Sequence, residues 1–306
     1  MTAQDSPDPM ALRRPILHWY RDHARDLPWR RPDTSAWGVL VSEVMLQQTP
    51  VVRVEPRWRE WMTRWPTPAD LAAAPTADVL RAWDRLGYPR RALRLREAAR
   101  AIATEHGGIV PADEQVLRAL PGIGDYTAAA VASFAYRRRA VVLDTNVRRV
   151  LARAVDGQAL PPPSPRRAER ERAEALLPRD GAASARWNVA VMELGALVCT
   201  ARSPRCAHCP IARRCAWVAA GRPADTHADR RRSQAWHGTD RQARGRVMAA
   251  LREQDQLSAA EVADLWPEPG QRDRILAALV TDGLAEAERD SDGVPLAYRL
   301  PAGGAS

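Results

Sequence analysis

The sequence predicts an all-α body over about residues 10–220, followed by a small module of three helices and a β-hairpin. Three observations support this prediction. Apolar residues recur at helical spacing through the body, Pro and Gly interrupt them repeatedly, and alternating apolar and polar runs are almost absent. With 306 residues, the chain is long enough for about two domains and a sizeable core.

The composition of the chain points to a polyanionic partner. Lys and Arg number 46 against 37 Asp and Glu, the formal charge is +9, and every one of these basic residues is Arg. Because a positive surface attracts phosphate, nucleic acid is the first candidate. No apolar run reaches the roughly 18 residues that a membrane helix needs. The polar start shows no secretory signal, so we expect a cytoplasmic protein with no membrane partner.

Proline and capping residues set the expected element boundaries. Thr67-Pro68 and Pro75-Thr76 each precede an acidic residue and an apolar helix face. The proline-rich segment 161–165 predicts a stiff connector before a charged helix over 166–177.

The last part of the chain is expected to form a separate module. Residues 223–238 are polar and Arg-rich and predict a linker. Over 239–306 we expect helices near 245–253, from 258 onward and near 271–282, and then two short strands around a turn at 291–293. Three helices and a hairpin predict a winged-helix-like unit.

All four cysteines fall between residues 199 and 215, as Cys199, Cys206, Cys209 and Cys215. Two disulfides are one interpretation, but a cytosolic setting and the close spacing favour metal. A zinc site is a second interpretation, although structural zinc usually shows two separated Cys-x2-Cys pairs. The four thiolates fit an iron–sulfur cluster better.

Residues 120–127 predict a helix-hairpin-helix. The segment reads Leu-Pro-Gly-Ile-Gly-Asp-Tyr-Thr and lies between helical runs at 115–119 and 128–136. Gly122 and Gly124 let the backbone approach closely, and the free N–H groups of the second helix suit a DNA phosphate. An ordinary helix–helix turn is the alternative for an isolated Gly-x-Gly.

Two acidic residues stand out by their places in the helices. Glu43 shares a helix face with apolar residues such as Val39 and Leu40. Because burial disfavours the charged form, Glu43 is expected to stay protonated near neutrality and to act as a general acid, unless it is a surface residue. Asp144 precedes a helix with the apolar face Val147 to Val155, and the simple alternative is a helix cap.

Together these segments resemble the endonuclease III superfamily of DNA glycosylases, and within it the adenine-DNA glycosylases of the MutY type. The string Met-Leu-Gln-Gln-Thr at 45–49 is typical of the adenine branch. The matching segments, in family order over roughly residues 10–220, are 27–30, 42–49, 86–88, 120–127, 143–150, 193–196 and the four cysteines.

The resemblance implies a helix-hairpin-helix glycosylase fold. A six-helix barrel is expected over 31–138, and an iron–sulfur lobe from 1–30 and 139–222 with one [4Fe-4S] cluster. Many members end in a Nudix-like β-rich domain, which closes over 8-oxoguanine. Residues 239–306 are too few and too helical for that domain, so a winged-helix-like module is expected to replace it.

The resemblance also implies roles for single residues. Glu43 is expected to protonate N7 of a flipped adenine and Asp144 to stabilise the developing sugar cation, with Tyr126 and Asn146 assisting. Residues expected to line the adenine pocket are Trp29, Arg30 and Leu46, of which Trp29 and Leu46 are alternatively plain core. Residues expected to wedge into the duplex and contact the opposite base are Gln48, Thr49, Leu86 and Tyr88.

The reaction that the resemblance implies is hydrolysis without strand cleavage. Bifunctional relatives place a Schiff-base lysine at the position of Tyr126, and this chain has no lysine. We therefore expect a monomeric, monofunctional glycosylase of base excision repair that removes adenine opposite 8-oxoguanine or guanine.

Two other functions remain open from the sequence. One is a thymine or uracil mismatch glycosylase, against which Gln47 and Gln48 argue. The other is an inactive redox-sensing DNA binder, against which Glu43 and Asp144 argue.

Overall fold

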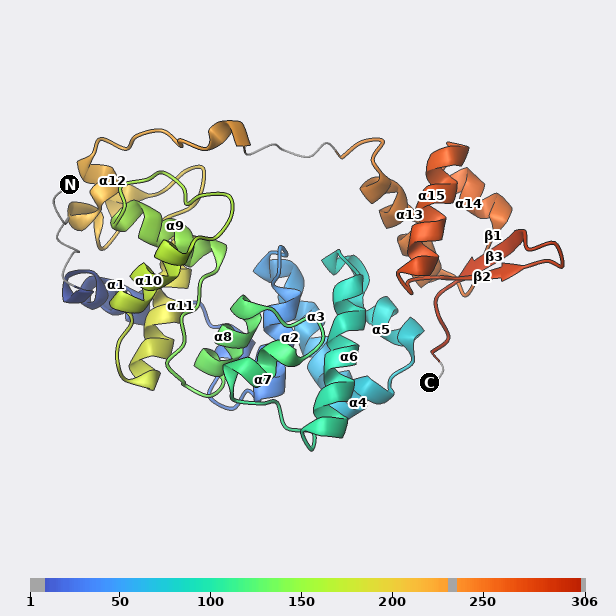
Figure 1. Cartoon of the computed structure of the whole chain (residues 1–306), viewed down its shortest axis with the longest axis horizontal. Coiled ribbons are helices and arrows are strands. Elements are labelled where there is room, and N and C mark those ends of the chain that lie inside the picture. Colours follow the sequence, from blue (N-terminus) through green and yellow to red (C-terminus); the bar gives the residue numbers. More distant parts are fainter. Residues whose placement is uncertain (1–8, 231–235, 304–306) are drawn as a thin grey trace. The chain divides into compact units, whose positions relative to one another are not determined.

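The structure is a computed structural model that describes residues 9–230 and 236–303 (Figure 1). The predicted linker is therefore described only on either side of 231–235. The chain forms two compact units. The first unit holds residues up to 36, 112–115 and 124–233, and the second holds 37–111, 116–123 and 234–306.

All regular secondary structure described in the first unit is helical. Its elements are α1 Pro9–His23, η1 Pro28–Arg30, α8 Asp125–Phe134, α9 Thr145–Ala154, α10 Arg167–Leu176, α11 Gly181–Leu197, η3 Cys206–His208, η4 Ala212–Arg214, α12 Ala216–Ala219 and η5 Ala228–Arg230. The predicted charged helix is α10. Helix α7, Glu114–Ala119, begins in this unit and ends in the other.

The core of the first unit forms where α9 packs against α1 and α11. The apolar face predicted for α9 is buried at Val147 and Leu151, and it meets Trp187 and Leu194 of α11. Gly195 is required at this contact, because a Cβ atom there would lie 2.6 Å from Cβ of Asn146. The close approach brings the N-terminus of α9 against α11.

The second unit contains the remaining helices and all three strands described. Its elements are α2 Ala36–Met45, α3 Val51–Arg64, α4 Pro68–Ala73, α5 Thr76–Trp83, η2 Asp84–Leu86, α6 Arg90–Glu105, α13 Asp240–Glu253, β1 Leu257–Ser258, α14 Ala259–Leu265, α15 Pro269–Thr281, β2 Glu286–Arg289 and β3 Pro295–Arg299. Outside this C-terminal part, the described chain has no strand, which confirms the all-α body.

Tryptophan builds much of the core of α2, α3 and α5. The ring of Trp61 contacts those of Trp65 and Trp83 at centroid distances of 4.8 and 5.4 Å. Buried indole N–H groups here donate to backbone carbonyls, as from Trp58 to Gly38 at 2.8 Å and from Trp61 to Ala82 at 3.1 Å. These hydrogen bonds satisfy a polar atom that would otherwise be costly to bury.

The C-terminal module has the order of elements of a winged helix. Strands β1, β3 and β2 form an antiparallel sheet in that spatial order, and α14 packs against β1 and β3. The sequence predicted the hairpin but not the two-residue strand β1. Helix α13 begins at Asp240, before the predicted start at 245, because Thr239 caps it by accepting from the N–H of Gln242.

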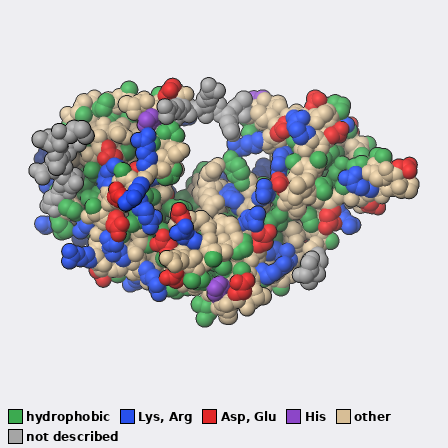
Figure 2. Space-filling model, in the orientation of Figure 1, with side chains coloured by type: hydrophobic (Ala, Val, Ile, Leu, Met, Phe, Trp, Pro, Cys, Tyr) green, Lys and Arg blue, Asp and Glu red, His purple; other side chains and the backbone are tan. Residues whose placement is uncertain are grey.

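The module packs on α5 and η2 of its own unit. Arg252 donates from Nε to the carbonyl oxygen of Leu80 at 3.1 Å, and Arg81 pairs with Asp255 at 3.1 Å. Over the face seen in Figure 2, arginine side chains lie among carboxylates. No helix in the described ranges is long and apolar enough to cross a membrane.

Candidate active site and iron–sulfur centre

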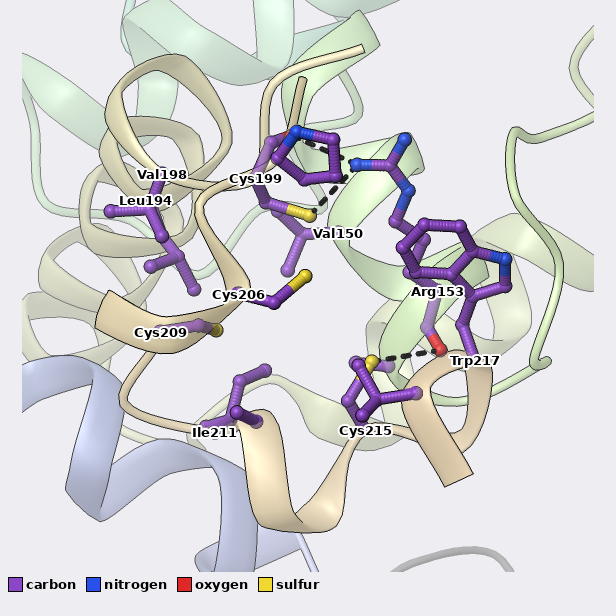
Figure 3. Close-up of a pocket in the computed structure, with 14 residues that line it drawn as sticks. Val150, Arg153, Leu194, Val198, Cys199, Cys206, Cys209, Ile211, Cys215 and Trp217 are labelled. Carbon is purple, nitrogen blue, oxygen red and sulfur yellow. Dashed lines mark hydrogen bonds between the residues drawn. The ribbon is translucent and has the colours of Figure 1, made fainter. Parts of the chain in front are cut away.

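The four cysteines surround one pocket in the first unit (Figure 3). All four are free thiols, which excludes the two disulfides. Cys199 follows α11, and the other three follow one another through η3 and η4. The rest of the lining is mostly apolar and includes Val150, Leu194 and Ile211.

The chemistry of this pocket fits a cluster of several metal atoms. Among the described residues, no group of three or more His, Cys, Asp or Glu side chains lies close enough to hold a single metal ion. Burial raises the pKa of Cys209 to about 11 and also raises the pKa of Cys215. Thiols in such a setting need a strong positive partner to ionise, and cluster iron supplies one.

Arg153 of α9 lies directly beside the pocket. Its Nη1 donates to Sγ of Cys199 at 3.3 Å and to the carbonyl oxygen of Thr200 at 2.7 Å. Its guanidinium also lies 4.6 Å from the ring centre of Trp217. A buried cation at this position offsets the negative charge of the thiolates.

Asp144 is the N-terminal cap of α9, and the cap geometry holds its carboxylate in one orientation. Oδ1 accepts from the backbone N–H of Val147 at 2.6 Å, and Oδ2 accepts from Nδ2 of Asn146 at 2.6 Å. Burial raises the pKa of Asp144 above its ordinary value, although these hydrogen bonds act in the opposite direction. Asp144 is therefore a helix cap, which was the simple alternative from the sequence, and its side chain is largely buried.

Arg149 connects this carboxylate site with the cysteine loop. Its Nη2 donates to Oδ1 of Asn146 at 2.7 Å and to the carbonyl oxygen of Gly195 at 2.8 Å. Its Nε donates to the carbonyl oxygen of Cys199 at 2.7 Å. Sequence reasoning missed Arg149, because an arginine on a helix usually indicates a surface position.

A second buried carboxylate organises the expected pocket residues of the first unit. Glu193 is fully buried and accepts from Arg25 and Arg30 at 2.7 and 2.8 Å. Burial alone would raise the pKa of Glu193, but these hydrogen bonds outweigh it and lower the pKa to about 2. Nη1 of Arg30 is also buried, and it has no hydrogen-bond partner in the described structure. Trp29 is buried and Tyr126, in the first turn of α8, is half-buried.

In the second unit, Glu43 lies in the apolar helix α2. Its side chain is 4% exposed, and Val39 and Leu40 on the same helix are also buried. The sequence expectation of an acid inside an apolar face is confirmed, and the alternative of a surface glutamate is wrong. Helix α2 ends at Met45, so Leu46 stands just beyond its end and is partly exposed.

Arg91 of α6 ties together two loops that carry expected DNA contacts. Its Nη1 donates to the carbonyl oxygens of Val44 and Gln47 at 2.9 and 2.5 Å. Its Nη2 donates to the carbonyl oxygens of Leu86 and Gly87 at 3.0 and 2.9 Å. Burial lowers the pKa of Arg91 to about 10, which leaves it charged at neutral pH.

The two loops present different side chains to solvent. Gln48 is exposed and Tyr88 is 45% exposed, and both have left-handed backbones with φ of 55° and 49°. Such conformations are uncommon outside glycine and concentrate at functional sites. Thr49 and Leu86 are buried instead, and Oγ1 of Thr49 donates to the carbonyl oxygen of Leu86 at 2.9 Å.

The predicted hairpin is present between α7 and α8. Gly122 has φ of 74° and passes so close to α6 that a Cβ atom would lie 2.6 Å from Cβ of Arg94. Gly124 has no such restriction. Beside the hairpin, a cleft of about 230 Å³ is lined by Arg90, Arg91 and Arg94 together with Gly122. Two of these arginines pair with carboxylates, Arg90 with Asp282 at 3.2 Å and Arg94 with Glu97 at 2.9 Å.

Comparison with known proteins identifies the family. Residues 41–178 match the HhH-GPD superfamily of base excision DNA repair proteins, and residues 199–215 match the iron-sulfur binding domain of endonuclease III. The adenine DNA glycosylase of Mycolicibacterium smegmatis is 55% identical over 278 residues, which are 90% of this chain and 92% of that relative. This chain belongs to the adenine DNA glycosylase family.

Other relatives agree with this assignment. An adenine DNA glycosylase of Mycobacterium tuberculosis is 53% identical to this glycosylase over 274 residues, 88% of each chain. The solved structure of a thermostable thymine-DNA glycosylase is similar with a TM-score of 0.63 and 27% identity, over 69% of this chain and 97% of that one. The helix-hairpin-helix glycosylase fold is confirmed.

Membership in the family establishes the general activity and the cofactor. The chain is a DNA N-glycosylase of base excision repair that binds double-stranded DNA, and its four cysteines hold one [4Fe-4S] cluster. The cluster interpretation of the cysteine spacing is therefore confirmed. The division into barrel, lobe, linker and module stays a prediction.

Proposed function

We propose that this adenine DNA glycosylase is monofunctional, works as a monomer, and removes adenine paired with 8-oxoguanine or guanine. The observation that carries the proposal is the setting of its two carboxyl groups. Glu43 is buried in an apolar helix, and Asp144 accepts two short hydrogen bonds at a helix N-terminus. A general acid needs the buried, apolar environment of Glu43. A carboxylate fixed at a helix N-terminus, such as Asp144, suits the stabilisation of a cation.

The two carboxyl groups divide the reaction between them. Glu43 donates its proton to N7 of the flipped adenine while the bond from C1′ to N9 breaks and its electrons leave with the base. The carboxylate of Asp144 stabilises the positive charge that then develops on the sugar, with Asn146 fixing its orientation. Water adds to C1′ and gives its proton to Glu43, which restores the acid and leaves an abasic site.

The proposed base pocket uses Trp29, Arg30 and Leu46. The free Nη1 of Arg30 supports this role, because a buried donor without a partner is costly unless a ligand satisfies it. Tyr126, which stands where lyases of the superfamily carry lysine, packs beside the base in this proposal. The chain has no lysine, so strand cleavage through a Schiff base has no nucleophile of that type.

On the opposite strand, we assign the contacts to Gln48 and Tyr88. Their exposure and left-handed backbones support this assignment. Thr49 and Leu86 are buried, and they support the two loops from behind. Gly122 and Gly124 bring the hairpin backbone close to a phosphate.

Base release from defined duplexes tests the proposal. Single-turnover reactions compare adenine opposite 8-oxoguanine, adenine opposite guanine, and thymine opposite guanine, each with and without alkali. We expect alkali-dependent cleavage at adenine alone, reduced about 1,000-fold in Glu43→Gln. Glu60→Gln, on the surface of α3, is the matched control and keeps the wild-type rate. Release of thymine, or equal rates in Glu43→Gln and wild type, would contradict the proposal.

A further inference from the structure

A cluster of exposed rings and one guanidinium joins the C-terminal module to the loop of Tyr88. The guanidinium of Arg241 lies 5.1 Å from the ring centre of Tyr88 and 5.5 Å from that of Trp236. Trp236 is 49% exposed and Tyr88 is 45% exposed. Large apolar side chains that stand together on a surface mark interaction sites.

Arg241 differs in its charge balance from the arginines around it. Arg244 of the same helix pairs with Asp282 at 2.6 Å, and Arg90 pairs with the same carboxylate at 3.2 Å. Arg241 contacts two rings and, within the described ranges, no carboxylate. Its charge is therefore available to an anion at the surface.

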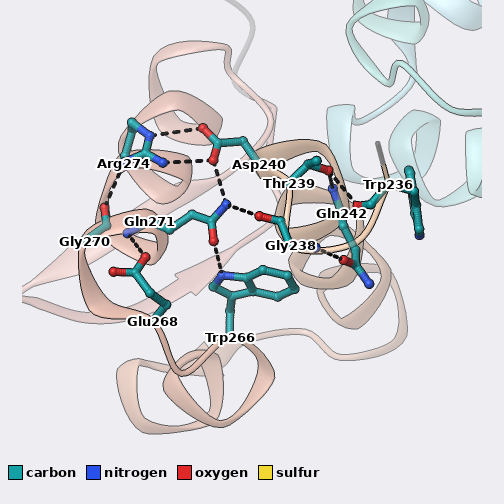
Figure 4. Close-up of polar contacts among 10 residues, drawn as sticks. All are labelled: Trp236, Gly238, Thr239, Asp240, Gln242, Trp266, Glu268, Gly270, Gln271 and Arg274. Carbon is teal, nitrogen blue, oxygen red and sulfur yellow. Dashed lines mark hydrogen bonds and ion pairs between the residues drawn. The ribbon is translucent and has the colours of Figure 1, made fainter. Parts of the chain in front are cut away.

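The segment that carries Trp236 is held in place (Figure 4). The hydroxyl of Thr239 donates to the carbonyl oxygen of Trp236 at 2.8 Å. Nε2 of Gln271 donates to the carbonyl oxygen of Gly238 at 3.0 Å, and the side-chain oxygen of Gln242 accepts from the N–H of Gly238 at 2.8 Å. The indole ring thus projects from a fixed backbone, which lowers the entropy lost when a ligand binds.

The other faces of the module do not suit DNA. The exposed side of α15 carries Asp273, and Arg274 on that side is neutralised by Asp240 at 2.9 Å. The hairpin of β2 and β3 exposes Glu288 and Asp290. These carboxylates disfavour phosphate contacts at the helix and wing that a winged helix usually offers to DNA, although the hairpin also exposes Arg289.

We propose that Tyr88, Arg241 and Trp236 form an additional DNA-contacting surface that stacks on and neutralises the strand opposite the excised base. Arginine and aromatic rings bind nucleic acid by stacking and by charge without needing a particular base. The strand assignment rests on the proposed function, because Tyr88 is placed there. The C-terminal module thus contributes through the start of α13.

Direct binding measurements test this surface without depending on catalysis. Fluorescence anisotropy with a labelled duplex gives Kd for the full-length holoenzyme and for Arg241→Ala, Trp236→Ala and Arg246→Ala. We expect about tenfold weaker binding for the first two variants. For Arg241→Ala, the slope of the logarithm of the binding constant against the logarithm of the salt concentration should fall in magnitude by about one. Arg246 is an exposed arginine of the same helix over Trp266 at 5.3 Å, and its removal leaves Kd unchanged.

Footprinting with hydroxyl radicals then assigns the strand. We expect Arg241→Ala to lose protection on the strand opposite adenine and to keep it on the adenine strand. A Kd equal to that of wild type in both Arg241→Ala and Trp236→Ala would overturn the proposed surface. Loss of protection on the adenine strand in Arg241→Ala would overturn the strand assignment. A wild-type protein that binds duplex but releases no adenine would contradict the proposed function and leave this surface intact.

Discussion

Asn146 donates a hydrogen bond of 2.6 Å from its side-chain amide to Oδ2 of Asp144. The amide oxygen of Asn146 accepts from Arg149 at the same time, so the amide cannot turn over without losing both bonds. The carboxylate is therefore oriented before any substrate arrives. Groups that are oriented in advance stabilise a developing charge without reorganising.

Removing this hydrogen bond should slow catalysis without unfolding the enzyme. We expect Asn146→Ala to lower the single-turnover rate of adenine release about 100-fold. Thr145→Ala, at the exposed neighbouring position, is the matched control and should keep the wild-type rate. An unchanged rate in Asn146→Ala would mean that the N–H of Val147 orients Asp144 without help from Asn146.

The pH dependence of the rate should report Asp144. Its pKa is raised by burial above the ordinary value of 3.8, and the proposed mechanism needs its anion. We therefore expect the rate to fall with falling pH at a midpoint above 3.8. Asn146→Ala removes a hydrogen bond that lowers this pKa, so its midpoint should lie at higher pH. A midpoint that is the same in both proteins would assign the titration to another group.

The raised pKa of Asp144 also affects the free energy of unfolding. A folded-state pKa above the unfolded value means that the ionised Asp144 opposes folding, and this cost is present in full above the folded-state pKa. Asp144→Asn should be inactive, and its free energy of unfolding at pH 7 should lie within about 1 kcal/mol of wild type, because asparagine also caps a helix. Urea unfolding measures this, and a loss of several kcal/mol would contradict it.

Glu193 should stabilise the fold with the opposite dependence on pH. Its pKa falls from 4.5 to about 2 on folding, so its contribution is present above 4.5 and is lost as the pH falls toward 2. We expect Glu193→Gln to lower the free energy of unfolding by about 3 kcal/mol at pH 7, because two arginines lose a buried partner. The difference from wild type should narrow at pH 3. Glu55→Gln, in a surface pair, serves as the control.

Arg91 should be required for the shape of two loops at once. Lysine keeps the charge but offers fewer donors in a different geometry, so we expect Arg91→Lys to weaken duplex binding and to lower the free energy of unfolding by about 2 kcal/mol. Anisotropy and urea unfolding measure the two effects. Arg100→Lys, an exposed position on α6, should change neither. Wild-type binding by Arg91→Lys would show that the loops hold their shape independently.

The position of Glu43, the capping of Asp144 and the grouping of the cysteines could all be predicted from the sequence. In each case a local sequence pattern predicts the position. Glu43 lies at helical spacing from apolar residues and is therefore buried with them, and Asp144 is a preferred capping residue directly before an apolar helix. The close spacing of the cysteines identified their site in the same way, and the family comparison confirmed its cluster.

The arginines that organise the site could not be predicted. Arg91 and Arg149 each bind several backbone carbonyls from distant segments, and these partners exist only after the chain has folded. In a chain whose 46 basic residues are all arginine, residue type alone does not mark them. Strand β1 was missed for a related reason, because two residues are too few for any periodicity to appear.

The clamp at Arg91 also has a consequence for how the enzyme searches DNA. Because one guanidinium holds both loops, Gln48 and Tyr88 cannot move independently of each other. Two separate loops would lose conformational entropy at every encounter with a duplex. In this protein, most of that loss has already occurred during folding. Under the proposed assignment of these two side chains to the strand opposite adenine, each insertion is brief and reversible, since neither loop has to become ordered again at the next base pair.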